Sequence, residues 1–150
     1  RDLLGVMHTE AAAGGALLIG VDLRKERAVL ERAYDDEAGV TAAFNLNLLA
    51  RINRELGADF DLDQFRHVAT WNPDDGRVEM RLVSRIDQRV TVSGQPIEFA
   101  ADEAILTEYS HKYELDEFAD LAADAGFGVD EIWVDDARLF SLQLLVRDGD

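Results

Sequence analysis

Nine consecutive residues, 105–113, bring together a carboxylate, two hydroxyls, two phenols, an imidazole and an ammonium. The segment follows a strand-like stretch and precedes a predicted helix that begins near Leu115. Because α/β proteins commonly place ligand-contacting side chains at such strand ends, we interpret it as one wall of a small-molecule pocket. The alternative is a strand-to-helix corner whose Tyr109 and Tyr113 are half-buried packing residues, since tyrosine is amphipathic. Residue types alone leave both interpretations open.

The bulk composition narrows the class of protein. A chain of 150 residues with 47% hydrophobic residues is enough for one domain with a real core. It has no apolar run long enough to span a bilayer and no signal-peptide pattern, so we expect a cytoplasmic location. The absence of cysteine excludes disulfides, thiolate zinc sites and cysteine nucleophiles. The first residue, Arg1, is not Met, which suggests a fragment or a processed product.

The charge argues against two classes of partner. The formal net charge is −16, from 31 acidic and 15 basic residues. Such a field repels phosphate backbones and anionic lipids, so we expect neither nucleic-acid nor membrane binding. The acids are spread along the chain, which is typical of a solvated surface. Three dispersed histidines, without acids at ligand spacing, do not predict a metal site.

The first part of the chain predicts a helix that ends before Gly14 and then a strand over Ala16–Leu23. This run is apolar at nearly every position and carries Asp22 near its end, a pattern typical of a buried parallel strand. No similar strand occurs in the next forty or so residues. We therefore expect that part of the sheet is missing from the chain.

The middle of the chain changes from helical to strand periodicity. Helices are predicted over 25–34 and 40–56, and asparagine is unusually frequent on the second, at Asn45, Asn47 and Asn53. A helical turn is expected at 61–65. Four antiparallel strands are then predicted, over 67–71, 77–85, 89–92 and 97–99. They are joined by turns at 72–76, 85–88 and 93–96.

Two features complete the expected pattern. In the strand over 77–85, alternation places Val78, Met80 and Leu82 on one face and Glu79 and Arg81 on the other. After residue 113 the chain predicts an amphipathic helix, 115–125, and two closing strands, 131–134 and 140–146. The predicted fold class is α/β.

Four motifs in order carry a family resemblance: 17–25 (LLIGVDLRK), 34–36 (YDD), 39–47 (GVTAAFNLN) and 107–113 (TEYSHKY). Together they resemble the histidine-specific S-adenosylmethionine-dependent methyltransferases, which trimethylate the α-amino group of L-histidine in ergothioneine biosynthesis. The resemblance implies the C-terminal part of a class I, Rossmann-like methyltransferase sheet. It also implies an inserted α+β substrate-recognition domain built on antiparallel strands.

The resemblance implies a division into three parts and places the cofactor elsewhere. Residues 1–24 would end the methyltransferase core with a helix and a parallel strand. Residues 25–109 would form the inserted domain, and 110–150 the last helix and two strands of the core. The family's S-adenosylmethionine site lies in its N-terminal half, and no strand–Gly-x-Gly–helix unit occurs here. The chain is thus expected to be inactive without that half, or to need a second chain.

The family also implies the residues that contact L-histidine, whereas it assigns no catalytic residue here. Glu108 would accept the imidazole N–H and Ser110 would satisfy the other ring nitrogen. Tyr34 would donate to the substrate carboxylate, and Met80 would form a soft wall. The remaining predicted lining residues are Tyr109, Thr41 and Phe44. This chain departs from the family at Tyr109, often Asn, and at Leu106, often His, which puts the fine specificity in question.

Simpler roles exist for several of these residues. Tyr34 could merely end a short helix, Met80 could be a core residue beside Val78 and Leu82, and Ser110 could cap the following helix. The competing functional hypothesis is a non-catalytic small-ligand binding or interaction domain derived from this fold. The apolar run 16–23 separates the two hypotheses, since an uncovered apolar edge indicates a missing part of the sheet.

Overall fold

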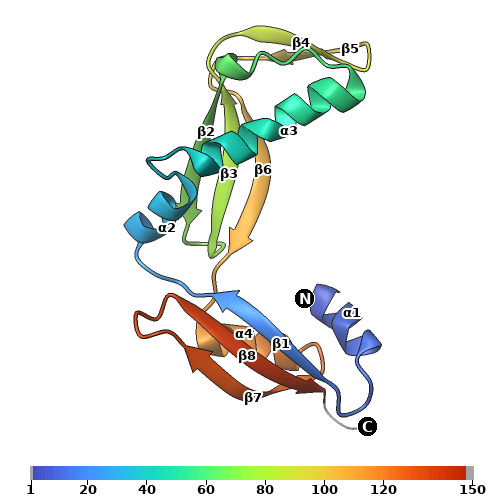
Figure 1. Cartoon of the computed structure of the whole chain (residues 1–150), viewed down its shortest axis with the longest axis vertical. Coiled ribbons are helices and arrows are strands. Elements are labelled where there is room, and N and C mark those ends of the chain that lie inside the picture. The colour runs from blue at the N-terminus through green and yellow to red at the C-terminus, as the bar shows by residue number, and fades with distance from the viewer. Residues whose placement is uncertain (1, 148–150) are drawn as a thin grey trace. The chain divides into compact units, whose positions relative to one another are not determined.

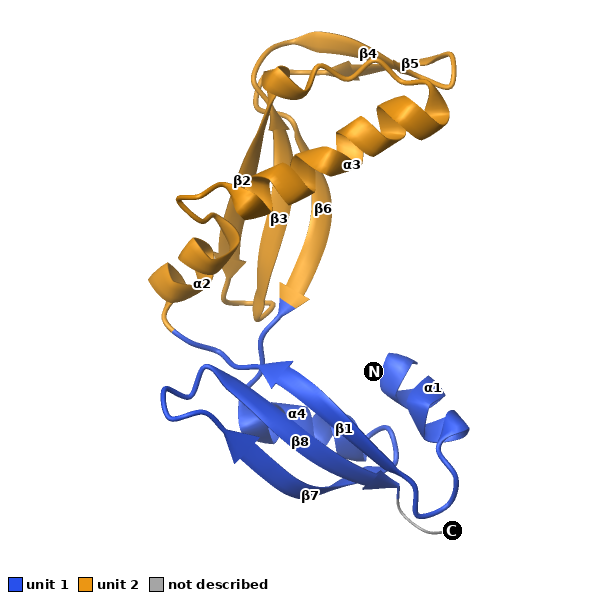
Figure 2. Ribbon diagram, in the orientation of Figure 1, with its two compact units in different colours: residues 1–25, 111–150 blue, residues 26–110 orange. Residues whose placement is uncertain are grey.

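The computed structural model describes residues 2–147, which form two compact units (Figure 2). Unit 1 is built from the chain up to Lys25 and again from His111 onward, and unit 2 is the intervening Glu26–Ser110. The assignment of unit 1 to a methyltransferase core, and of unit 2 to substrate recognition, stays a prediction.

Unit 1 is a three-stranded antiparallel sheet with helices (Figure 1). Its core joins Leu4, Val21, Phe118, Phe127 and Leu145. Its elements are α1 (Asp2–Glu10), β1 (Ala16–Asp22), α4 (Leu115–Ala123), β7 (Phe127–Val134) and β8 (Phe140–Arg147), and the strand order is β1-β8-β7.

Strand β1 differs from its prediction in two respects. Its partner is β8, and the pairing is antiparallel; among residues 2–147, parallel pairing of the predicted strand is limited to an isolated bridge between Leu23 and Tyr113. The prediction that both faces are buried is wrong here, because exposure alternates along the strand and Leu18 is 56% exposed. The sheet ends at β1, and no strand within the described residues pairs with its outer edge, where the Asp22 carbonyl accepts the Tyr113 N–H at 3.1 Å.

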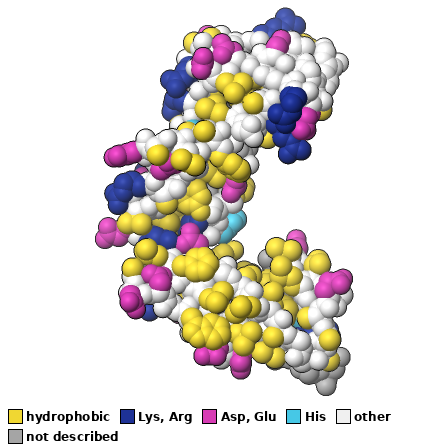
Figure 3. Space-filling model, viewed as in Figure 1, with side chains coloured by type: hydrophobic (Ala, Val, Ile, Leu, Met, Phe, Trp, Pro, Cys, Tyr) yellow, Lys and Arg dark blue, Asp and Glu magenta, His cyan; other side chains and the backbone are white. Residues whose placement is uncertain are grey.

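One face of this sheet is apolar and uncovered. Leu18, Phe140, Leu142 and Trp133 are all large and exposed, and the strand pairing sets Leu142 opposite Trp133. Hydrophobic side chains gather over this sheet in Figure 3. Exposed apolar patches of this kind usually mark a surface that contacts another part of a protein or a partner.

Unit 2 places two helices on an antiparallel sheet of order β2-β3-β6, with a separate β4-β5 hairpin (Figure 1). Its elements are α2 (Arg27–Tyr34), α3 (Val40–Leu56), a 3₁₀ turn η1 (Leu62–Gln64), β2 (Phe65–Asn72), β3 (Arg77–Ser84), β4 (Gln88–Val92), β5 (Gln95–Phe99) and β6 (Ala104–His111). The predicted turn at 85–88 does not pair β3 with β4, because β3 lies between β2 and β6.

Strand β3 carries the predicted alternation. Val78, Met80 and Leu82 are buried, and they enter the two apolar clusters that α2 and α3 cover. The lower cluster joins Met80 to Leu30 at the centre of α2, and the upper one joins Leu82 to Leu49 of α3. The helices are thus fixed on the face of the sheet where the candidate site lies. Among the described residues, no helix combines the length and apolarity needed to cross a membrane.

Candidate functional site

Two predicted ligand-contacting residues meet through their hydroxyls. Tyr34, the last residue of α2, lies with its phenol oxygen 2.7 Å from Ser110 Oγ on β6. The two residues are 76 positions apart, so the fold alone brings them together. The alternative role of Ser110 as a helix cap is wrong, because Glu114 caps α4 in a capping box with Glu117.

Met80 lies behind this pair. Its side chain is only 4% exposed and belongs to the cluster against which Tyr34 packs. Its backbone carbonyl accepts a hydrogen bond of 2.9 Å from Thr107 Oγ1, which ties β3 to β6. Met80 therefore packs in the core, as a member of the cluster that supports Tyr34.

A pocket of about 240 Å³ opens between α3 and β6. It is lined by Phe44, Asn45, Asn47, Leu48, Arg51, Thr107 and Glu108. The Glu108 side chain is exposed, and within residues 2–147 its carboxylate has neither a hydrogen bond nor an ion pair. Phe44 is 68% exposed, which is unusual for phenylalanine. The pocket is smaller than the roughly 300–1,000 Å³ of drug-sized sites and suits a molecule of amino-acid size.

A chain of neutral hydrogen bonds joins this pocket to Tyr34. Asn45 Nδ2 lies 2.9 Å from His67 Nδ1, and His67 Nε2 lies 2.7 Å from the Tyr34 carbonyl oxygen. Asn45 is 5% exposed although it is polar. The sequence did not assign Asn45 or His67 to the site; the one signal was the frequency of asparagine on α3.

Asp36 fixes the start of α3, where the predicted residue Thr41 lies. Its carboxylate accepts the backbone N–H groups of Val40 and Thr41 at 3.0 and 2.9 Å. These two hydrogen bonds, of which the one from Thr41 has the larger effect, lower the pKa of Asp36 to about 2. The anion at the helix N-terminus also interacts favourably with the helix dipole. Thr41 is thus held in the first turn of α3, and Phe44 follows three positions later, one helical turn further along.

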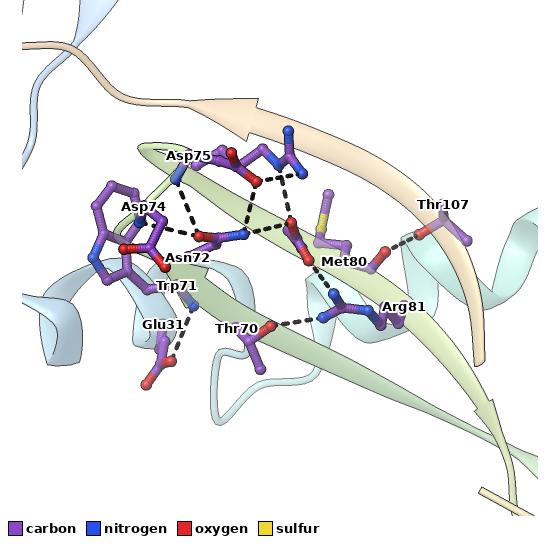
Figure 4. Close-up of polar contacts among 11 residues, drawn as sticks. Glu31, Thr70, Trp71, Asn72, Asp74, Asp75, Met80, Arg81 and Thr107 are labelled. Carbon is purple, nitrogen blue, oxygen red and sulfur yellow. Dashed lines mark hydrogen bonds and ion pairs between the residues drawn. The ribbon is translucent and has the colours of Figure 1, made fainter. Parts of the chain in front are cut away.

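The other face of the same sheet carries an ionic cluster (Figure 4). Glu79 is 5% exposed and accepts from Asn72 Nδ2 at 3.1 Å and from Arg77 Nε at 2.9 Å, and it pairs with Arg81. The hydrogen bond from Asn72, together with both arginines, lowers the pKa of Glu79. The Arg77 guanidinium lies 3.8 Å from the centre of the Tyr109 ring.

The structure therefore separates the predicted residues into groups. Tyr34, Met80 and Ser110 form one cluster, whereas Glu108 and Phe44 line the neighbouring pocket. Tyr109, between Glu108 and Ser110 in the chain, has its ring under Arg77.

The glycines at positions 14, 15 and 20 do not form the glycine-rich turn that would hold S-adenosylmethionine. A glycine-rich turn serves a cofactor by leaving space where a side chain would stand. At Gly20 that space is filled, because a Cβ atom there would lie 2.5 Å from the Phe140 ring. Gly14 and Gly15 lie between a helix and a strand, which is the reverse of the required order.

Comparison with known proteins gives one consistent result. Residues 1–147 match the family described as histidine-specific methyltransferase, SAM-dependent. The chain is 48% identical over 148 residues to a histidine N-alpha-methyltransferase of Mycolicibacterium smegmatis, covering 97% of this chain and 46% of that protein. It is 46% identical over 147 residues to the protein of the same name from Mycobacterium tuberculosis, covering 97% and 44%.

A more distant relative differs in its named substrate. The L-tryptophan methyltransferase trpM of Psilocybe serbica is 30% identical over 135 residues, covering 86% of this chain and 37% of that protein. The chain thus spans under half the length of each of these three relatives.

Proposed function

Because this chain belongs to the SAM-dependent histidine-specific methyltransferase family, we propose that it supplies the substrate-binding part of an enzyme that methylates the α-amine of L-histidine. Two relatives that are nearly half identical to the chain carry the name histidine N-alpha-methyltransferase. The proposal concerns the whole enzyme, of which this chain corresponds to the C-terminal half.

The observation that carries the proposal is the meeting of Tyr34 and Ser110 at 2.7 Å, next to the unpaired carboxylate of Glu108. Two hydroxyls and one acid offer donors and acceptors to an imidazole, which in its neutral form presents one N–H and one bare nitrogen. Glu108 accepts the ring N–H in a charge-assisted bond. Ser110 donates to the other ring nitrogen, and Tyr34 donates to the substrate carboxylate.

These residues act on the reaction by positioning. Methylation of an amine requires its nitrogen lone pair to be free and directed at the methyl donor, so an enzyme gains most by fixing the substrate's orientation. S-adenosylmethionine supplies the methyl group when it is bound. We expect the residues that hold it outside the described part of the chain, beside the outer edge of β1 and the apolar face of its sheet.

The test is a titration of the full-length protein that carries these residues, with L-histidine and S-adenosylmethionine measured separately by calorimetry. Glu108→Gln removes the charge but keeps the shape, and we expect it to weaken L-histidine binding roughly tenfold to a hundredfold. Affinity for S-adenosylmethionine should stay within twofold of that of the unmodified protein.

Glu98→Gln on β5 is the matched control, because Glu98 is also an exposed strand acid of unit 2. It should leave the affinity for L-histidine unchanged. Equal losses of both ligands in Glu108→Gln would remove Glu108 from the substrate site. L-tryptophan serves as the competing ligand, and tighter binding of L-tryptophan than of L-histidine would reassign the substrate. A protein that binds neither amino acid would support the non-catalytic alternative.

A further inference from the structure

The orientation of the Asn45 side-chain amide is fixed by two neighbours. Its Nδ2 lies 3.4 Å from the backbone carbonyl of Arg81 and 2.9 Å from His67 Nδ1. A carbonyl oxygen can only accept a hydrogen bond, so the NH₂ end of the amide must face Arg81. Both N–H groups of Asn45 are then engaged, one by Arg81 and one by His67.

This arrangement also fixes the tautomer of His67. Because Asn45 donates to Nδ1, that nitrogen is bare and accepts. The proton is therefore on Nε2, which donates to the Tyr34 carbonyl at 2.7 Å. Both ring nitrogens of the neutral imidazole are therefore hydrogen-bonded. An asparagine amide can be placed in two orientations that exchange Oδ1 and Nδ2, and His67 selects the one in which Nδ2 faces the ring.

The remaining polar atom of Asn45 is its carbonyl oxygen, Oδ1. No donor among residues 2–147 hydrogen-bonds to it, and it is not one of the fully enclosed side-chain atoms. Asn45 lines the pocket that also contains the unpaired carboxylate of Glu108. An amide acceptor in a side chain that is only 5% exposed is costly unless a donor reaches it, and the pocket is where one can.

We propose that Asn45 Oδ1 accepts a hydrogen bond from an N–H group of the amino-acid substrate beside Glu108, and that His67 is the positioning residue that keeps this oxygen directed into the pocket. The inference rests on the proposed function, because it adds a second acceptor to the same site. Two acceptors, one charged and one neutral, select for a ligand that presents more than one N–H group. L-histidine does so through its ring and its amine.

The first test changes Asn45 and uses a matched asparagine on the same helix. Asn45→Leu removes both the donor and the acceptor while keeping the number and branching of the side-chain heavy atoms, and we expect L-histidine to bind the full-length protein about fivefold to tenfold more weakly. Asn53→Leu is the control, because the Asn53 side chain does not line the pocket. Its amide donates to the Phe60 carbonyl and accepts the Phe60 N–H, both at 2.8 Å. The substitution should lower the Tm but leave L-histidine affinity within twofold.

The second test separates positioning from general stability and applies even where Asn45→Leu fails to fold. His67→Asn places an amide oxygen near the Nδ1 position and keeps the acceptor for Asn45. His67→Gln places an amide nitrogen near the Nε2 position and keeps only the donor to Tyr34. We expect His67→Asn to retain a lower KM for L-histidine than His67→Gln, with similar kcat and similar affinity for S-adenosylmethionine.

Two outcomes overturn the inference while leaving the proposed function intact. One is unchanged L-histidine affinity in Asn45→Leu, or a loss no larger than that in Asn53→Leu. The other is an equal KM in the two His67 variants. If the unmodified protein does not bind L-histidine at all, the proposed function fails and the inference fails with it.

Discussion

The two faces of the β2-β3-β6 sheet stabilise their buried polar groups in different ways. On the face covered by α2 and α3, the buried Asn45 and the half-buried His67 form neutral hydrogen bonds that end at the Tyr34 backbone carbonyl. On the opposite face, Glu79 is buried between two arginines. The strand β3 contributes to both, because its side chains alternate between the faces.

The difference indicates what each face is for. A neutral hydroxyl such as Ser110 Oγ can exchange a protein partner for a ligand at small cost, which suits a binding site. A buried ion pair loses much more when one partner is removed, so it fixes the strands in place. We infer that the ionic face holds the strands and that the neutral face, with Glu108 at its edge, meets the ligand.

The largest expected effect concerns the apolar support of the neutral face. Leu82 is fully buried between the sheet and α3. Leu82→Ala should lower the free energy of unfolding by about 3 kcal/mol, since it removes buried methyl groups and leaves a cavity. Urea denaturation measures this change. A loss under 1 kcal/mol would show that α3 is not held by this contact.

Breaking the ionic face should cost somewhat less. Glu79→Gln leaves both arginines without their shared carboxylate, and we expect a loss of about 2 kcal/mol in the free energy of unfolding. Glu98→Gln is the matched control, because its ion pair with Arg89 is exposed and should be worth at most about 0.5 kcal/mol. Equal losses would mean that burial does not strengthen the Glu79 cluster.

The hydroxyl pair on the neutral face should contribute less still. Tyr34→Phe removes the phenol oxygen from its contact with Ser110 Oγ, at an expected cost of about 1 kcal/mol. Combining it with Ser110→Ala in a double-mutant cycle isolates the pair from their other contacts. A coupling energy near zero would show that the two hydroxyls do not bond to each other in solution.

The smallest effect is a pH dependence at the start of α3. The folded-state pKa of Asp36, about 2, lies below the roughly 3.9 of an unfolded aspartate. Its contribution to stability is therefore fully present above about pH 4 and is lost as the pH falls through about 2. The difference in Tm between the unmodified protein and Asp36→Asn should be constant at higher pH and shrink over this window. A difference that does not change with pH would contradict this role.

Much of the fold could be predicted because it depends on local patterns. The period-two alternation in β3 and the helical spacing in α3, with Gly57 after its end, each encode an element directly. The pairing of β1 could not be predicted, because a uniformly apolar run is compatible with either strand direction. The turn at 93–96 correctly predicted the β4-β5 hairpin, whereas the turn at 85–88 wrongly suggested that β3 pairs with β4, since a short turn resembles a hairpin whether or not its strands pair.

The candidate site was predictable only where residue type is distinctive. Glu108 stands out in a strand that ends near a helix, and a family resemblance added Tyr34 and Ser110. Asn45 and His67 were missed because their role depends on a contact across 22 residues and on which nitrogen carries a proton. Neither a contact between distant residues nor a tautomer can be predicted from the spacing or periodicity of residues in the sequence.

A crystal structure of the full-length protein with L-histidine bound tests the central claim most directly. We predict that one imidazole nitrogen lies within about 3 Å of the Glu108 carboxylate, a hydrogen-bonding distance, with the Tyr34 and Ser110 hydroxyls in contact with the same molecule. A ring bound elsewhere, with Glu108 in contact only with solvent, would contradict the account.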